Sequence, residues 1–231
     1  MLFRSLRTSG QAGRHAPLIT SGSVAIGTTR WGARPARFAG RRWDRPVVDL
    51  EALDEADPAL ARWVGRRLRP KLVVATQTPV LVAAVDPDGW WVPSVPVVSV
   101  EPHDGPGVDP DALWLAAAVL AAPVVSAWAA ARFAGAGLSA SGLRLSATQL
   151  LELPVPQFEA PWREASVLLR AALRPSPHRS DRSDRPGGRD LRALWRRNGE
   201  LMAEAYGVDA VTAAGVARWW EQAAARYLPS P

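Results

Sequence analysis

The strongest constraint on the fold is an uncharged run of nineteen residues, at positions 113–131. A helix of this length is long enough to cross a lipid bilayer. Nine of the nineteen residues are alanine, which gains little from contact with lipid, and Pro123 interrupts the run near its middle. The run therefore predicts two short helices buried in a protein core, and a chain that does not enter a membrane.

The residues around this run predict an α+β fold: a small mixed sheet with a β-hairpin packed by helices, and a helical C-terminal tail. Residues 71–76 and 80–85 are short apolar strand candidates, and the Asp-Pro-Asp-Gly sequence at 86–89 is typical of a turn. Residues 90–100 are expected to return as the second strand of that hairpin. Pro93 and Pro96 favour a place at the edge of the sheet.

Several helix boundaries are marked by capping residues. Asp57 and Pro58 predict a helix start, because aspartate caps free N–H groups and proline suits the first turn. Ser146 predicts the cap of a short helix, which Pro154 and Pro156 stop. Two amphipathic helices are expected in the tail, near residues 190–206 and 212–227.

Composition divides the chain into four predicted parts. Residues 1–45 form a basic N-terminal connector, which is irregular between Arg30 and Pro46, and residues 46–173 form the α+β domain. Residues 174–189 contain only polar residues, proline and glycine, and predict a flexible linker. Residues 190–231 then form a helical tail that is separable from the main domain.

The net charge of +6 is unevenly distributed along the chain. Residues 1–70 have a net charge of +7, residues 71–157 of −4 and residues 158–231 of +3. Six arginines cluster near Trp31, Phe38 and Trp43, in a pattern suited to phosphate oxygens and to stacking: Arg30, Arg34, Arg37, Arg41, Arg42 and Arg45. A solvated surface loop is the alternative interpretation, because arginine supplies every basic side chain of this chain except Lys71.

Few residues suggest catalysis or metal binding. The chain has no cysteine, and its histidines, at positions 15, 103 and 178, lack the spacing of metal ligands. The Phe-Ala-Gly-Ala-Gly sequence at 133–137 looks like a loop that binds S-adenosylmethionine, but it follows a predicted helix and is interpreted as a helix end. The N-terminus lacks a secretory apolar segment, which favours a cytoplasmic location.

The order of four segments resembles the C-terminal part of N-6 adenine DNA methyltransferases of restriction-modification systems. These segments are residues 18–46, 69–100, 115–128 and 142–156. In that family a catalytic half precedes a target recognition domain. The resemblance implies that Pro70 and Lys71 begin the recognition region, that residues 113–131 match an apolar helix pair, and that the Leu-Pro-Val-Pro exit closes the region.

The resemblance implies DNA recognition without methyl transfer. The family's Asn/Asp-Pro-Pro-aromatic loop, which holds the flipped adenine, is missing, and Asn198 is the only asparagine. We therefore expect no S-adenosylmethionine binding by this chain, with the cofactor on a missing catalytic half. We expect Lys71 and Arg144 to face double-stranded DNA and Gln77 to read an adenine edge through its amide.

The preferred interpretation is a target recognition module, either a fragment or a separately encoded partner of a methyltransferase catalytic chain. One alternative is a helical module that docks on a partner protein through Trp195, Trp219 and Trp220. A third is an enzyme for a small molecule with an unrecognised site. A basic face over residues 30–71 favours the first interpretation, an exposed Trp/Leu patch the second, and a deep polar pocket the third.

Overall fold

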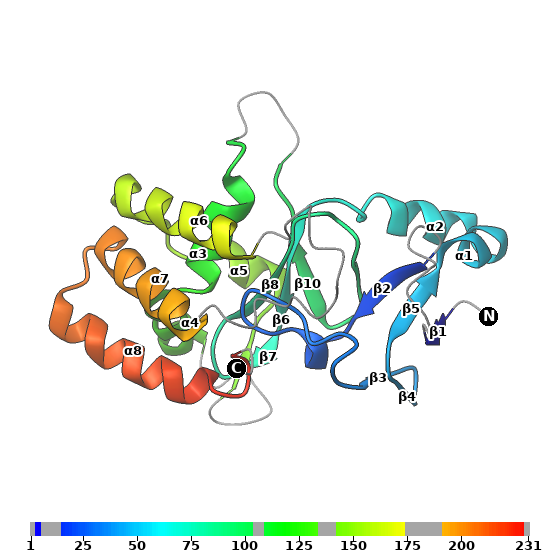
Figure 1. Ribbon diagram of the computed structural model, residues 1–231, viewed down its shortest axis with the longest axis horizontal. Coiled ribbons are helices and arrows are strands. Elements are labelled where there is room, and N and C mark those ends of the chain that lie inside the picture. The colour runs from blue at the N-terminus through cyan, green and yellow to red at the C-terminus, as the bar shows by residue number, and fades with distance from the viewer. Residues whose placement is uncertain (1–2, 6–14, 104–108, 134–141, 174–190, 229–231) are drawn as a thin grey trace.

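The computed structural model describes residues 3–5, 15–103, 109–133, 142–173 and 191–228. It confirms the α+β class. Helices α3 to α8 gather at one end of the molecule, α1 and α2 lie at the other end beside β1 and β5, and the central sheet lies between the two groups of helices (Figure 1). Two hydrophobic clusters follow this division: a large one under α3 to α8 and a small one under α1 and α2.

The first sheet has four strands in the order β1–β5–β2–β9. Only β2 and β9 pair in parallel within it. Its strands are β1 (Phe3–Ser5), β5 (Pro46–Asp49), β2 (His15–Ile19) and β9 (Val92–Pro93). Because β2 pairs with β5, a domain boundary at residue 45 would cut through one sheet. The described part of the predicted N-terminal connector is therefore integral to the fold.

Helices α1 (Leu50–Ala56) and α2 (Pro58–Gly65) follow β5 directly. The carboxylate of Asp57 accepts the N–H groups of Ala59 and Leu60, and Pro58 occupies the first turn, as predicted. Helix α1 was not anticipated, because its short acidic sequence has only one residue, Leu53, that is buried. Leu53 of α1 and Val64 of α2 pack into the smaller hydrophobic cluster.

The central sheet has three antiparallel strands in the order β10–β6–β8: β10 (Val97–Val100), β6 (Lys71–Ala75) and β8 (Val82–Asp86). The hairpin predicted across residues 86–89 is wrong: it would pair β10 with β8, whereas β10 pairs with β6. Asp86 accepts the N–H groups of Trp90 and Trp91, which turns the chain toward β9 in the first sheet. The edge position predicted for this proline-containing segment is confirmed.

The apolar run forms two buried helices, α3 (Ala112–Leu120) and α4 (Pro123–Phe133). They meet at an angle of 64° on either side of the break that Pro123 was predicted to cause. Within the described ranges no single helix is long and apolar enough to span a membrane, and only this bent pair passes that test as a whole. Most of its side chains lie in the larger hydrophobic cluster.

Helix α5 (Ala147–Leu151) is capped by Ser146, whose hydroxyl accepts the N–H of Gln149 while the Gln149 amide oxygen accepts the N–H of Ser146. It ends before the predicted prolines. The chain then enters α6 (Glu159–Leu173), which packs against α3. Strand β11 (Leu143–Arg144), just before α5 in the chain, pairs with β7 (Gln77–Thr78) in a two-stranded ladder.

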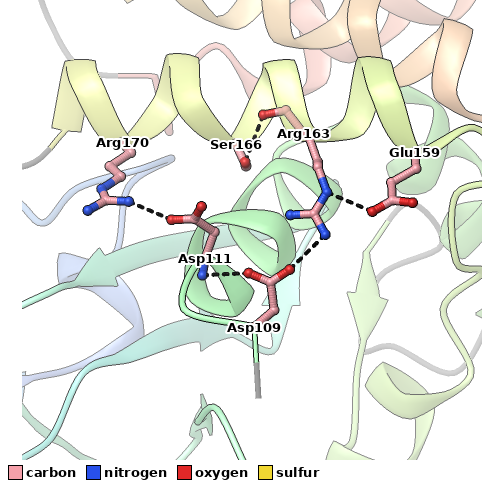
Figure 2. A network of polar contacts seen from close by, with 6 residues as sticks. All are labelled: Asp109, Asp111, Glu159, Arg163, Ser166 and Arg170. Carbon is pink, nitrogen blue, oxygen red and sulfur yellow. Dashed lines mark hydrogen bonds and ion pairs between the residues drawn. The ribbon is translucent and has the colours of Figure 1, made fainter. Parts of the chain in front are cut away.

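A group of ion pairs joins α6 to the start of α3 (Figure 2). Arg163 contacts Asp109 at 2.8 Å and Glu159 at 2.6 Å, and Arg170 contacts Asp111 at 2.6 Å. The N–H of Asp111, followed by Arg163, holds the pKa of Asp109 below its usual value. These side chains are exposed in part, so they orient the two helices more than they stabilise them.

The C-terminal helices α7 (Leu191–Ala205) and α8 (Ala210–Ala224) are part of the main core. Helix α7 packs against α6 and α3, and α8 packs against α4. Trp195 and Trp220 are each only 2% exposed. The prediction of a separable tail is therefore wrong, because both helices contribute buried apolar side chains to the core of the domain. The predicted linker at 174–189 lies outside the described residues.

Candidate nucleic-acid interface

The predicted irregular basic segment contains a two-stranded ribbon. Strands β3 (Ala36–Phe38) and β4 (Arg41–Trp43) pair in an antiparallel manner around Ala39 and Gly40. Ala39 has a φ of 48° and Gly40 a φ of 72°, and two positive values are typical of a type I′ turn. This turn fixes the register of the strands, so it decides which side chains face one another.

The ribbon has an apolar face and a basic face. Ala36 is buried, Phe38 packs against the smaller cluster, and the indole N–H of Trp43 donates to the carbonyl of Phe38 at 3.0 Å. On the opposite face Arg37 stands directly across from Arg42. The apolar contacts therefore hold the ribbon so that these two guanidinium groups point to solvent.

Four of the six predicted arginines are exposed at this ribbon or just before it: Arg34, Arg37, Arg41 and Arg42. Side chains opposed in an antiparallel pair have Cβ atoms about 5 Å apart, so the like charges of Arg37 and Arg42 repel. Folding places them together nonetheless. An anion between them would relieve this repulsion, and a phosphate suits two guanidinium forks.

Arg30 and Arg45 are half-buried, and each contacts another part of the protein. The guanidinium of Arg30 donates to the carbonyls of Arg226 and Leu228, which ties the residues that follow α8 to the N-terminal segment. Burial, followed by the charge of Arg34, lowers the pKa of Arg30. The guanidinium of Arg45 lies over the ring of Trp31, 5.1 Å from its centre. The guanidinium groups of these two residues are therefore less available to phosphate than those of the ribbon.

Lys71 is fully buried, so the prediction that it contacts DNA is wrong. Its ammonium donates to Asp86 at 2.6 Å, directly across the β6–β8 ladder, and to the carbonyl of Arg69 at 3.2 Å. Burial lowers the pKa of Lys71 despite the attraction of Asp86. The pair links β6 to β8 below the turn at residues 86–89.

Gln77 and Arg144 are brought together by the structure, although they lie far apart in the sequence. They stand opposite each other in the β7–β11 ladder, and both side chains are exposed. The neighbouring Thr78 and Leu143 are buried and fix the ladder from its other face. An amide and a guanidinium thus project side by side, and both groups match the edges of purine bases.

Two features of the surface were missed from the sequence. The arginine opposition across β3–β4 could have been found from Ala-Gly flanked by alternating apolar and basic residues. A large groove between α7 and α8 was also missed, because alanine is common in helices whether or not they line a groove. Of the tail tryptophans expected to dock on a partner, only Trp219 reaches the surface, at 37% exposed. The Trp-based docking surface is therefore not present as predicted.

The described residues contain no group of three His, Asp or Glu side chains placed to hold a metal ion. Of the Phe-Ala-Gly-Ala-Gly sequence, Phe133 ends α4 and the rest lies outside the described ranges. No protein-family model matches this chain, and no curated protein shows significant sequence similarity to it.

Proposed function

We propose that this chain is a DNA-binding target recognition module of an N-6 adenine DNA methyltransferase or restriction-modification system. In this proposal it selects the sequence, and a separate catalytic domain or chain supplies S-adenosylmethionine and methyl transfer. The opposition of Arg37 and Arg42 on the exposed face of β3–β4 is the observation that supports it most. Like charges across a ribbon cost stability, and phosphate binding gives that arrangement a use.

Two kinds of contact are combined in this proposal. The ribbon arginines neutralise phosphates and act on all sequences alike. Gln77 and Arg144 read bases, because a glutamine amide pairs with adenine and a guanidinium pairs with guanine in the major groove. Lys71 is left out of the proposed interface because it is buried, and Arg30 and Arg45 are left out because each contacts another part of the protein.

The phosphate contacts are tested by fluorescence anisotropy with a labelled duplex at low salt. Replacing Arg37, Arg41 and Arg42 with Ala is expected to weaken binding to every duplex. The slope of log affinity against log salt should flatten by about 3 units, close to one per lost contact. The matched control replaces three arginines of α7 and α8, and so removes the same charge: Arg192, Arg196 and Arg218. This control should change the slope by less than about 1 unit.

The proposal fails if the unaltered protein does not bind duplex DNA at low salt, or if both triple variants behave alike. The base contacts are tested separately by selection from a random-sequence duplex pool. Gln77→Ala and Arg144→Ala should each relax preference at one position, by about 1–3 kcal/mol, without changing the salt slope. If the sequence preference is unchanged in both variants, the β7–β11 ladder does not contact bases.

A further inference from the structure

Helices α7 and α8 enclose a long groove. A short connection at residues 206–209 joins them, so they form an antiparallel hairpin (Figure 1). Each is held to the domain by other helices, and between them lies a groove of about 1030 Å³. Trp195, Trp220 and Pro123 contribute apolar lining. A 15-residue helix such as α8 is about 22 Å long, so the groove can follow several turns of a third helix.

The walls of the groove are built from small side chains. On α8 they lie at spacings of three and four residues, which places them on one face: Ala210, Ala213, Ala214 and Ala217. Gly199 and Ala203 continue the lining on α7. Small residues allow the backbone of another helix to approach closely, and packed helices stand about 8–10 Å apart. A helix therefore fits this lining better than a globular surface does.

The charged rim of the groove differs between its two ends. Arg192 and Arg196 line the first half of α7, and Glu200 and Glu204 line its second half. Successive residues of this set are four positions apart, which places them in one row along the helix. Because α8 runs back along α7, Arg218 and Glu221 lie toward the basic end. The groove lining thus has a net positive end near the start of α7 and a negative end near its finish, where Glu200 also lies 3.5 Å from the exposed guanidinium of Arg197.

Segments of this chain outside the described ranges do not match such a groove. Residues 174–190 contain no apolar side chain other than proline, and residues 134–141 contain no charged one. Residues 1–2, 104–108 and 229–231 are too short to fill several helical turns, and residues 6–14 contain no acidic side chain. These segments therefore lack the combination of apolar and oppositely charged side chains that would match the groove.

We propose that the α7–α8 groove binds an amphipathic helix of a partner protein. Its apolar face packs on the alanines of α8, its basic end lies beside Glu200 and Glu204, and its acidic end lies beside Arg192, Arg196 and Arg218. This site is separate from the β3–β4 ribbon, and the inference does not rest on DNA binding.

The probe is a fluorescein-labelled helical peptide of about five turns, with Leu and Ala along one face, Glu residues in its first turn and Lys residues in its last. A second peptide has the same composition, with Glu and Lys mixed along the polar face. The polarised peptide should bind about fivefold more tightly in fluorescence anisotropy, as expected for a few exposed charge pairs. Changing Glu200 and Glu204 to Lys should abolish that preference.

A steric variant tests the place of binding. Ala214→Trp fills the groove and should weaken binding of the polarised peptide by about tenfold or more, since several apolar contacts are lost at once. The control Val211→Trp lies on the same helix, 84% exposed and outside the groove lining, and should bind as the unaltered protein does. Equal affinity for the two peptides, or no effect of Ala214→Trp, would overturn the proposal. So would a dimer, seen by sedimentation equilibrium, that Ala214→Trp alone dissociates, because the occupant would then be a second copy.

Discussion

Replacing Trp195 with Ala tests whether α7 and α8 belong to the core of the domain. The indole of Trp195 is 2% exposed and lies with Gly27, Leu72 and Leu169 around a small void. These neighbours come from the N-terminal loop, the central sheet and α6. The substitution therefore removes a contact between segments that lie far apart in the chain.

The expected loss of stability is about 4 kcal/mol, within the range of about 3–5 kcal/mol for buried Trp→Ala changes. The indole nitrogen has no hydrogen-bond partner among the described residues, so the loss comes from packing alone. Gly27 has a φ of 76° and no side chain to fill the space. Trp219→Ala is the control: its side chain is 37% exposed. Loss of that partly exposed side chain should cost about 1 kcal/mol.

The assay is urea unfolding followed by circular dichroism at the helical band and by NMR signals of the central sheet. Trp195→Ala should shift one cooperative transition to lower urea with an unchanged slope. Gly27→Ala should also destabilise, because its Cβ would lie 2.5 Å from the Trp195 ring. The double variant should lose less than the two single losses combined, since the smaller alanine side chain in place of the indole leaves room for that Cβ. Two separate transitions, with the sheet midpoint unmoved, would refute the integration of α7 and α8.

Three further outcomes follow from buried groups. Lys71→Met should cost about 3 kcal/mol in denaturant unfolding, because it leaves the buried carboxylate of Asp86 without its cation; a neutral effect would contradict the pairing. Gly89→Ala should cost about 2 kcal/mol or more in the same assay, because the residue has a φ of 73° and its Cβ would lie 2.5 Å from the backbone of Arg69. Burial raises the pKa of Tyr206, so the folded state keeps the phenol proton longer than the unfolded chain does. The folded state therefore keeps its full stability below about pH 10, and it loses stability as the pH rises above this value. In thermal melts, Tyr206→Phe should abolish this part of the pH dependence.

Local signals in the sequence were enough for the helix boundaries. Asp57 with Pro58 begins α2, and the Ser146 cap begins α5, because each acts on N–H groups two or three positions away. Pro123 breaks the apolar run, because proline disrupts a helix wherever it stands in the interior. The alanine content of that run, together with Pro123, predicted correctly that it forms two helices in the core.

The outcome for the candidate site was mixed for a physical reason. Arg37 and Arg42 were expected at a surface, and they are exposed, but the ribbon that opposes them depends on a turn with positive φ at Ala39. Arg30 and Arg45 look the same as these residues in the sequence. Arg30 contacts the residues that follow α8, almost two hundred positions away in the chain. Arg45 contacts the ring of Trp31.

The sequence by itself determined the α+β class, the buried helix pair and the capped helix starts, because these depend on neighbours within a few residues. The tertiary structure alone decided that Lys71 is buried, since its charge is compensated only when β6 and β8 bring Asp86 beside it. It also decided that Trp195 belongs to the core and that β10 pairs with β6. Such outcomes depend on which apolar faces and strand edges meet, and that choice is made by the packing of the whole chain.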